Sequence, residues 1–207
     1  MSLKLIIQIS LLFVGLKISA QEPSLEHLFQ SELQQKNENV TSIKCDFIQE
    51  RNISVLNSSV SKEGTFYFTK PCNMLLAFND GDYIKMTSTW FEMSTAGHVS
   101  AKKSNSNPMF RNLNSILTAC VVGDFDKIKK GFDIQYSKSA TDYIVTLIPQ
   151  RGKAISQISR IIISFDKTNM SLNDMQMIEK SGNSTSYTFK NKEFNLPLDS
   201  KLFNITE

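Results

Sequence analysis

The residues of this chain that could carry out catalysis or hold a metal ion are few and far apart. The sequence has 2 histidines, His27 and His98, and neither has a cysteine or an acidic residue at the spacing of a metal site. It contains no Gly-x-Ser-x-Gly motif, no phosphate-binding loop and no His-Glu-x-x-His motif. These absences predict a protein that is not an enzyme and that needs no metal or cofactor.

Paired acidic residues are the remaining candidates for chemistry. Asp80 and Asp82 form one such pair, Asp124 and Asp126 the other, and both occur in short polar segments typical of turns. Two carboxylates can serve as the acid and base of a glycosidase. A hydrolase therefore stays open as a third alternative, although the shortage of histidines and of a nucleophile favours solvated turns.

The cysteines allow two interpretations. There are 3 of them, Cys45, Cys72 and Cys120, so at least one thiol is unpaired. If the first two strands turn near residues 57–60, Cys45 lies roughly opposite Cys72, and a disulfide across the strands is one hypothesis. The alternative is three unpaired thiols that pack as small apolar side chains.

The first 20 residues have the three regions of a secretory signal peptide. Lys4 is followed by an apolar run at residues 5–16 and by a small residue, Ala20, at the expected cleavage site. A retained N-terminal anchor is the alternative. Removal of the signal peptide would take away Lys4 and Lys17, which are two of the 23 Lys and Arg of the chain. The remaining 21 nearly balance the 20 acidic residues, so no nucleic-acid partner is expected. Residues 21–207 are expected to form a single domain.

Residues 43–78 show the period-two alternation of strands that are buried on one face. In the first part the apolar residues occupy odd positions, and Asn57-Ser58-Ser59 has the composition of a turn. The apolar face then continues at even positions up to Phe78. Its members are Ile43, Cys45, Phe47, Ile53 and Val55 before the turn, and Phe66, Phe68, Met74, Leu76 and Phe78 after it. Such a face must be covered, either by the protein's own core or by a bound guest.

Two helices interrupt the strands. Ser24 can cap a helix that runs to about Lys36, with Leu25, Leu28, Phe29 and Leu33 on one stripe. A second stripe, at residues 113–121, includes Ile116 and Leu117 and ends at Gly123. The other segments are short, alternating and closely spaced, which predicts an antiparallel sandwich or barrel.

Four segments resemble, in order, the LolA family of periplasmic lipoprotein carrier proteins. Residues 43–50 (Ile-Lys-Cys-Asp-Phe-Ile-Gln-Glu) are similar to its first strand, and residues 63–71 (Glu-Gly-Thr-Phe-Tyr-Phe-Thr-Lys-Pro) to the strand that ends in Arg/Lys-Pro. Asn107-Pro108 followed by Ile116-Leu117 is similar to the helical lid. Residues 143–149 and 158–165, with 186–189 near the end, look like the later strands.

The resemblance implies a mainly β fold with some α: an open, curved antiparallel β-barrel, or half-barrel, covered by helices. It also implies an apolar cavity that holds lipoprotein acyl chains in the periplasm, an inner-membrane release complex, an outer-membrane acceptor and a monomeric carrier. Lys70 stands where the family has an arginine that helps to hold the lid closed. The wall would be drawn from Phe47, Phe66, Phe68, Met74, Leu76, Phe78, Met86 and Trp90, and the helical cover from Leu25, Leu28, Phe29, Ile116 and Leu117.

Three departures from the family pattern indicate a distant member. Lysine cannot make the bidentate hydrogen bonds of arginine, residues 87–89 (Thr-Ser-Thr) lack the expected glycine, and Leu76 stands where an aromatic residue is common. The competing hypothesis is an envelope adaptor, a non-enzymatic module that binds another lipid or a protein partner.

Overall fold

The computed structural model describes residues 23–104, 108–150 and 157–206. The predicted signal peptide, residues 1–20, lies outside these ranges. Among the described helices, none combines the length and the apolar character needed to cross a membrane.

The described part of the chain folds around one sheet of 11 strands, in the order β6-β5-β4-β3-β2-β1-β11-β10-β9-β8-β7. The strands pair antiparallel with their neighbours. Their bounds are β1 Ser42–Ile53, β2 Ser58–Thr69, β3 Asn73–Phe78, β4 Tyr83–Met86, β5 Trp90–Thr95, β6 His98–Lys103, β7 Phe132–Lys138, β8 Asp142–Pro149, β9 Ile158–Asp166, β10 Leu172–Glu179 and β11 Ser184–Phe194.

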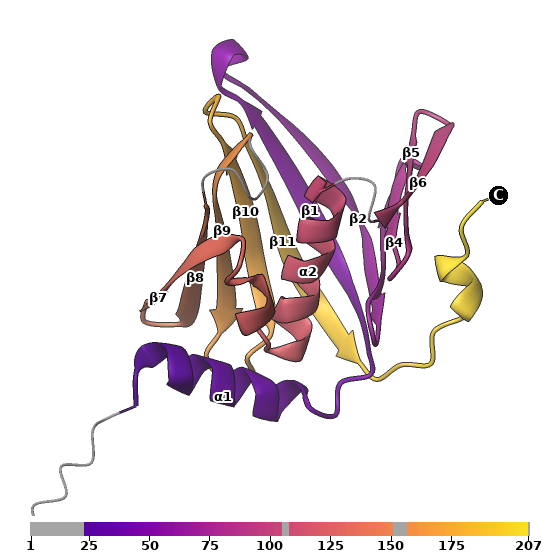
Figure 1. The fold of residues 1–207 in the computed structure, drawn as a ribbon. Coiled ribbons are helices and arrows are strands. Elements are labelled where there is room, and N and C mark those ends of the chain that lie inside the picture. The colour runs from indigo at the N-terminus through magenta and orange to yellow at the C-terminus, as the bar shows by residue number, and fades with distance from the viewer. Residues whose placement is uncertain (1–22, 105–107, 151–156, 207) are drawn as a thin grey trace, which may run out of the picture.

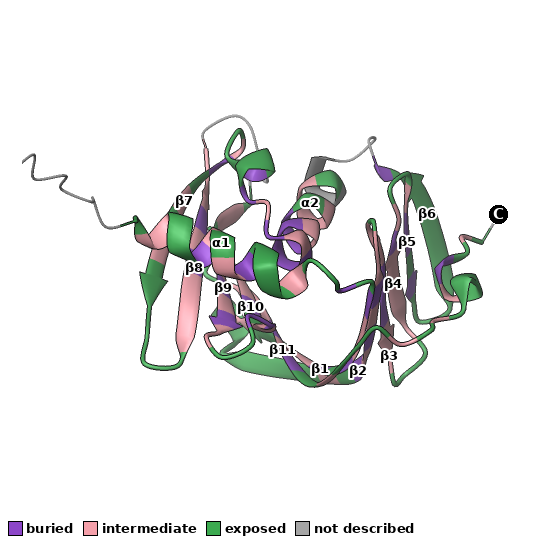
Figure 2. Ribbon diagram, turned by 90° about the horizontal axis from the view of Figure 1, so that it is seen from below, coloured by how far each residue is buried: buried purple, intermediate pink, exposed green. Residues whose placement is uncertain are grey.

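The sheet is bent into a trough and does not close (Figures 1 and 2). Strands β7 to β9 form one wall, β1 and β2 lie at the floor, and β4 to β6 form the other wall (Figure 2). The edge strands β6 and β7 are not paired with each other. This confirms the predicted open, curved antiparallel barrel.

Gly64 marks a tight point in the floor of the trough. It lies opposite Phe47 on β1 and Phe78 on β3. A Cβ atom there would come within 2.1 Å of the Ala77 carbonyl oxygen and 2.9 Å of the Phe47 ring. Glycine therefore allows the rings of Phe47 and Phe78 to meet edge to face over it, with centroids 5.1 Å apart.

The hairpin of β1 and β2 corrects the predicted cysteine pairing. Its turn is a 3₁₀ turn at Ser54–Leu56, earlier in the chain than expected, and β2 begins at Ser58. Cys45 consequently lies opposite Phe66. Cys72 falls beyond the end of β2, and all three cysteines are free, so the disulfide hypothesis is wrong.

Two helices lie on the concave side of the sheet (Figures 1 and 2). Helix α1, Leu25–Asn37, begins as predicted at Ser24, whose hydroxyl accepts a hydrogen bond from the His27 backbone N–H. Helix α2, Pro108–Val122, ends at Gly123, where φ is +80°. The Gly123 N–H bonds the Ala119 carbonyl, the left-handed cap expected of a glycine at this position.

The C-terminal segment is fastened to the convex side. Glu92 of β5 is fully buried there and pairs with Lys85 of β4 at 3.0 Å. The same carboxylate accepts hydrogen bonds from the Tyr83 hydroxyl and from the backbone N–H and hydroxyl of Thr206. Lys85 also donates to the Asn204 carbonyl at 2.7 Å. One buried ion pair thus holds the end of the described chain against the wall of the trough.

Candidate functional site

The concave face of the sheet is a continuous apolar surface that crosses the floor and both walls. Period-two alternation aims every second side chain of each strand into the trough. The rows run across the sheet in register, as in Cys45, Phe66, Leu76 and Ile84. The members on β2 to β5 are Phe66, Phe68, Met74, Leu76, Phe78, Ile84, Met86 and Phe91, and those on β8 to β11 are Val145, Leu147, Ile161, Ile163, Phe165, Met175, Met177, Tyr187 and Phe189.

Helix α2 packs its apolar stripe on this face. Leu113 and Leu117 line the same narrow gap as Phe66, Leu76 and Met177. Ile116 is fully buried, and Ala119, Cys120 and Val121 are nearly so. The polar side of α2 makes a further link, because the Asn114 amide donates to the Thr87 carbonyl at 3.1 Å. The helix is therefore held by apolar packing together with a hydrogen bond at its flank.

Helix α1 is attached to the wall formed by β7, β8 and β9 through one aromatic residue. Phe29 is fully buried, and its ring lies 5.1 Å from that of Phe165 on β9. It also contacts Tyr136 on β7, Tyr143 on β8 and Phe125 in the segment after α2. Aromatic pairs at these distances each contribute about 0.5–1.5 kcal/mol beyond their burial. The Phe29 cluster thus fixes α1 to the strands at one edge of the sheet.

Gly123 and Lys70 both contact α1, the first from the end of α2 and the second from the end of β2. A Cβ atom on Gly123 would come within 2.9 Å of the Gln34 side chain, so α1 lies directly against the end of α2. Lys70, just before the turn from β2 to β3, donates to the carbonyls of Asn37 and Glu38 at 3.1 and 3.0 Å. A cation that satisfies the last carbonyls of a helix is favourable for both hydrogen bonding and the helix dipole. These bonds are made to α1 and not to α2, which carries the predicted lid residues Ile116 and Leu117.

The space between α2 and the sheet is almost filled. Two small voids lie there among the described residues, of about 20 Å³ among Phe66, Leu117 and Met177, and about 30 Å³ near Cys45 and Cys120. Such volumes suit about one water molecule each, whereas a dry cavity of about 150 Å³ is needed to hold benzene. The apolar cavity that the resemblance implies is therefore not an open space under α2 in this conformation, because the stripe of α2 occupies the trough.

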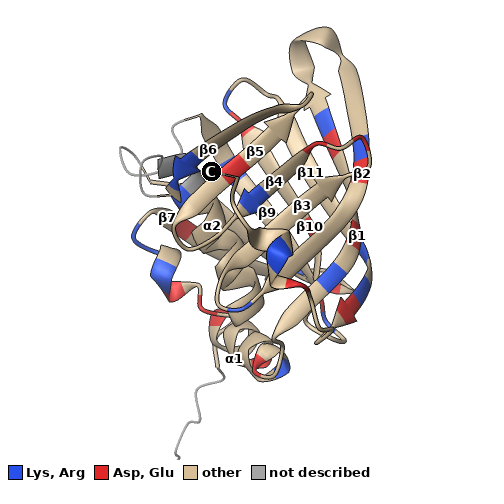
Figure 3. Cartoon of the chain, turned by 90° about the vertical axis from the view of Figure 1, so that its right-hand side faces the viewer, with Lys and Arg blue, Asp and Glu red and all other residues tan. Residues whose placement is uncertain are grey.

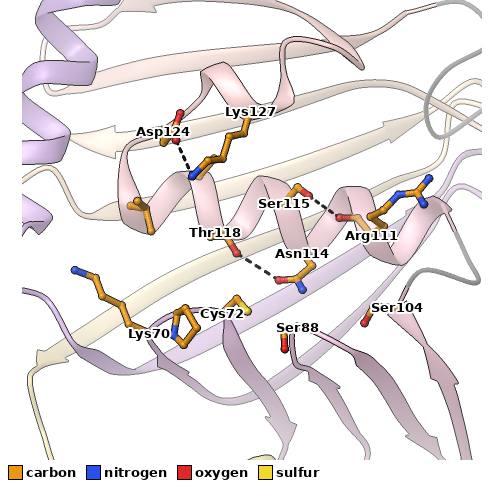
Figure 4. A pocket seen from close by; sticks show the side chains of 13 residues that line it. Lys70, Cys72, Ser88, Ser104, Arg111, Asn114, Ser115, Thr118, Asp124 and Lys127 are labelled. Atoms are coloured by element: carbon orange, nitrogen blue, oxygen red, sulfur yellow. Dashed lines mark hydrogen bonds and ion pairs between the residues drawn. The ribbon is translucent and has the colours of Figure 1, made fainter.

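A larger cavity, of about 720 Å³, lies along the opposite flank of α2. It separates the polar side of the helix from the turns of the sheet (Figure 4). The lining residues that Figure 4 labels are Lys70, Cys72, Ser88, Ser104, Arg111, Asn114, Ser115, Thr118, Asp124 and Lys127. Most of the surface that lines this groove is apolar, but hydroxyls, an amide and charged groups are set within it, so it is a mixed surface and not a purely apolar one. The apolar face beneath α2 remains the better candidate.

Most of the predicted wall and cover residues come together in this site. Phe47, Phe66, Phe68, Met74, Leu76 and Met86 are buried in one cluster with Phe29, Ile116 and Leu117, and Phe78 packs against it. Leu25, Leu28 and Trp90 are not members of this cluster. Trp90 alternates with the inward-facing Phe91 and so shares the convex face with Glu92. Leu28 is 40% exposed, because α1 turns its Phe29 and Leu33 side inward.

Sequence reasoning missed half of the site. Leu113, Met175, Met177, Tyr187 and Phe189 line the gap under α2, yet none was predicted to bind a ligand. The alternation in the late strands was visible in the sequence. What was missing was the pairing of β11 with β1, which brings Phe189 opposite Phe47.

No catalytic arrangement is found among the described residues. The acidic pairs are ion-paired at turns: Asp80 and Asp82 with Lys62 at 2.7 and 2.6 Å, and Asp124 with Lys127 at 2.9 Å. Burial raises the pKa of the Cys45 thiol to about 12, which makes it a poor nucleophile. Within the described ranges no cluster of His, Cys, Asp or Glu could hold a metal ion. The site is built for apolar contact.

Comparison with known proteins agrees with this geometry. Residues 38–206 match a family described as outer membrane lipoprotein carrier protein LolA. The search of curated proteins gives no match.

Solved structures match most of this chain at low sequence identity. A conserved protein from Thermus thermophilus has 6% identity and a TM-score of 0.53, over 87% of this chain and 93% of that one. A DUF1329 family protein from Desulfovibrio piger has 11% identity and a TM-score of 0.47, covering 88% of this chain and 98% of that one. A LolA superfamily protein from Nitrosomonas europaea has 8% identity and a TM-score of 0.45, covering 85% and 97%.

Proposed function

Because this chain belongs to the LolA family of outer membrane lipoprotein carrier proteins, we propose that it carries lipoprotein acyl chains across the periplasm to the outer membrane. The observation that supports this proposal is the continuous apolar face of an open sheet, on which a covering helix packs its apolar side chains. The cargo would be received from an inner-membrane release complex and delivered to an outer-membrane acceptor. No catalytic group is required for either step.

In this proposal, acyl chains take the place of the α2 stripe. The sheet keeps its own ladder of strand pairing when α2 moves, since none of that pairing involves α2. Gly123 and the Gln34 contact lie at the C-terminal end of α2, where the helix would pivot. The conformation with the α2 stripe packed on the sheet is then the closed one.

The energies of the exchange are of similar size. Exposing Ile116, Leu117 and Val121 costs roughly 5–9 kcal/mol, taking 1.5–3 kcal/mol for each buried side chain of this type. A buried methylene contributes about 0.8 kcal/mol, so roughly six to eleven methylenes offset the cost. A nearly balanced exchange permits both loading and release.

The lining also suits a cargo of variable shape. Met74, Met86, Met175 and Met177 all belong to the concave cluster or pack against it. Methionine is unbranched and polarizable and adapts to irregular apolar surfaces. A carrier of many different lipoproteins needs contacts of this tolerant kind.

Uptake of a fluorescent fatty-acyl probe by the purified protein tests the proposal. Met177→Asp places a charge beside the gap under α2 and should weaken probe binding by about tenfold or more. Leu28→Asn is the matched control, because Leu28 lies on the exposed side of α1 and its change should leave probe binding as it is. A folded protein that takes up no probe would overturn the carrier function.

The small size of the interior voids favours one competing function. An envelope adaptor that works through its outer surface needs no interior space, and voids of about 20 and 30 Å³ satisfy that condition. The adaptor hypothesis predicts a protein partner that binds equally well after complete delipidation. It also predicts that this partner and the acyl probe do not compete.

A further inference from the structure

The tip of the β1–β2 hairpin carries exposed aliphatic side chains. Val55 is 87% exposed, Leu56 is 68% exposed and Val60 is 51% exposed. Figure 1 shows the hairpin projecting beyond the ends of the neighbouring strands. Soluble surfaces tolerate single exposed apolar residues, but a group on a projection marks an interaction site.

This tip is held in a defined shape. Ser54 donates from its backbone N–H to the Asn183 side chain at 3.0 Å, and from its hydroxyl to the Ser181 carbonyl at 3.2 Å. Asn57 closes the 3₁₀ turn with a φ of +44°. The neighbouring β10–β11 turn therefore braces the hairpin, and the aliphatic side chains are presented on a fixed scaffold.

The tip is uncharged, and charges of both signs flank it. Residues 52–61 include no Asp, Glu, Lys or Arg, and the charged residues next to them are Glu50 and Arg51 on one side and Lys62 and Glu63 on the other. Lys62 is ion-paired with Asp80 and Asp82. Figure 3 shows the end of the hairpin free of charged residues, with charges beginning lower on its strands. An uncharged aliphatic point can enter a bilayer without carrying a charge into it, and placing a charge in lipid is costly.

We infer that this hairpin tip, Val55, Leu56 and Val60, docks the protein on a lipid bilayer by inserting among the headgroups and the first part of the acyl chains. A protein pocket is the less suitable occupant. Hot spots between proteins are enriched in Trp, Tyr and Arg, whereas Leu and Val are under-represented in them. The tip presents only aliphatic side chains, and it is convex.

The inference goes beyond cargo binding, because it sets the orientation of the molecule on the membrane. Helix α1 crosses the end of the trough away from the hairpin tip (Figure 1). With the tip in the bilayer, the end of the trough that α1 leaves uncovered faces the lipid. Docking by the tip does not require that the trough hold acyl chains, so the two proposals can fail separately.

Flotation with vesicles of phosphatidylethanolamine and phosphatidylglycerol tests the inference. The full-length mature protein should float with the vesicles, and Val55→Asp and Leu56→Asp should each reduce the bound fraction by about tenfold. Val99→Asp is the control, because Val99 on β6 is 50% exposed but lies outside the hairpin. A Leu56→Trp variant should show a blue-shifted emission that brominated lipid quenches.

Each outcome decides the matter. Loss of flotation in both tip variants, retained flotation in the Val99 variant and unchanged acyl-probe uptake in all three supports docking by the tip. Failure of the wild-type protein to float, or tip variants that float like the wild type, overturns it. Probe uptake is scored separately, so a negative result there refutes the carrier proposal and leaves the flotation result standing.

Discussion

Replacing Asn114 with alanine should loosen α2 and thereby strengthen binding of an acyl probe. Asn114 lies on the polar flank of the helix, beside the large groove, and not in the apolar gap under it. Its amide donates to the Thr87 carbonyl at 3.1 Å, which joins the helix to the turn between β4 and β5. The substitution therefore removes a fastening of the closed state without changing the surface that a hydrocarbon would touch.

The size of the effect follows from what else these groups bond. The Thr87 carbonyl also accepts from the Ser104 hydroxyl at 3.4 Å, so it is not left without a donor. The Thr118 hydroxyl loses its contact to Asn114, but that contact lies within α2 and is lost equally in the open state. The net change is that of one ordinary hydrogen bond, about 1 kcal/mol.

A change of this size shifts the closed-to-open ratio about fivefold. When the binding-competent state is a minor one, the apparent dissociation constant is inversely proportional to its population. Voids of about 20 and 30 Å³ exclude an acyl chain, so the closed state is not the competent one. The apparent affinity of the Asn114→Ala variant for a fatty-acyl probe should accordingly rise about fivefold, measured by fluorescence titration.

Ser115→Ala provides the matched control for this titration. Ser115 is next to Asn114 and exposed, but its hydroxyl donates to the Arg111 carbonyl of the same helix at 2.9 Å. Its loss affects both states equally and should leave probe affinity unchanged. If Asn114→Ala binds the probe no better than the wild type while its Tm falls, α2 and the probe do not compete, and the proposed exchange is refuted.

Three further substitutions test the joints of the fold. Gly123→Ala forces an L side chain into a positive φ against Gln34 and should lower the free energy of unfolding by about 1–3 kcal/mol in urea titrations. Lys70→Met removes the donor to the last carbonyls of α1 and should cost about 1–2 kcal/mol, with faster amide exchange in α1. Glu92→Gln breaks a buried ion pair and should cost about 3 kcal/mol at pH 7, with loss of amide protection at Thr206.

The effect of Glu92 should depend on pH in a defined direction. Burial alone would raise the pKa of Glu92, but hydrogen bonds from Thr206, Lys85 and Tyr83 outweigh it and hold the pKa below its ordinary value of 4.5. A lowered pKa stabilises the fold above pH 4.5, and this stabilisation disappears as the pH falls below 4.5 through the folded-state pKa. The difference between the wild type and Glu92→Gln should therefore shrink on acidification; a constant difference from pH 7 to pH 3 would contradict it.

The other two substitutions have their own controls. Lys70→Arg keeps a cation within reach of the α1 carbonyls, so it should retain most of the stability that Lys70→Met loses. Gly81→Ala is the comparison for Gly123→Ala, because Gly81 also has a positive φ of +91° but no neighbour within 4 Å of an added Cβ. Equal losses at the two glycines would show that contact with Gln34 contributes nothing.

Most of the strands and helices could be predicted because they have one apolar face. Phe66 and Phe68 alternate with more exposed neighbours along β2, and this pattern survives in the folded chain. Ser24 and Gly123 marked helix ends for local reasons, a side-chain cap and a left-handed φ. Such signals act over a few residues and are legible in a single sequence.

Hairpin register and the inward side of a strand depend on distant contacts and were not legible. Val55 was counted as part of an alternating strand, but it lies in the 3₁₀ turn, which moves the turn and puts Cys45 opposite Phe66. Trp90 and Phe91 are both aromatic, so their strand has an apolar residue on each face. Pairing of Phe91 with Met86 decides that Trp90 faces outward.

The filling of the space under α2 could not be predicted for a related reason. Periodicity shows that α2 has an apolar stripe and that the sheet has an apolar face. It does not show whether the helix spans the trough at a distance or lies down in it. The answer depends on the fit of particular side chains, such as Leu117 against Phe66 and Met177, and the fit closes the space almost completely.

The free edges of the sheet affect how wide a ligand the protein can enclose. A closed barrel has a circumference fixed by its strand number and stagger, and widening it means breaking hydrogen bonds. Here β6 and β7 are not bonded to each other, so the walls can splay by small changes of twist spread over many strands while every rung is kept. As a carrier of the proposed kind, one chain would enclose one tail or several with no change in its strand pairing.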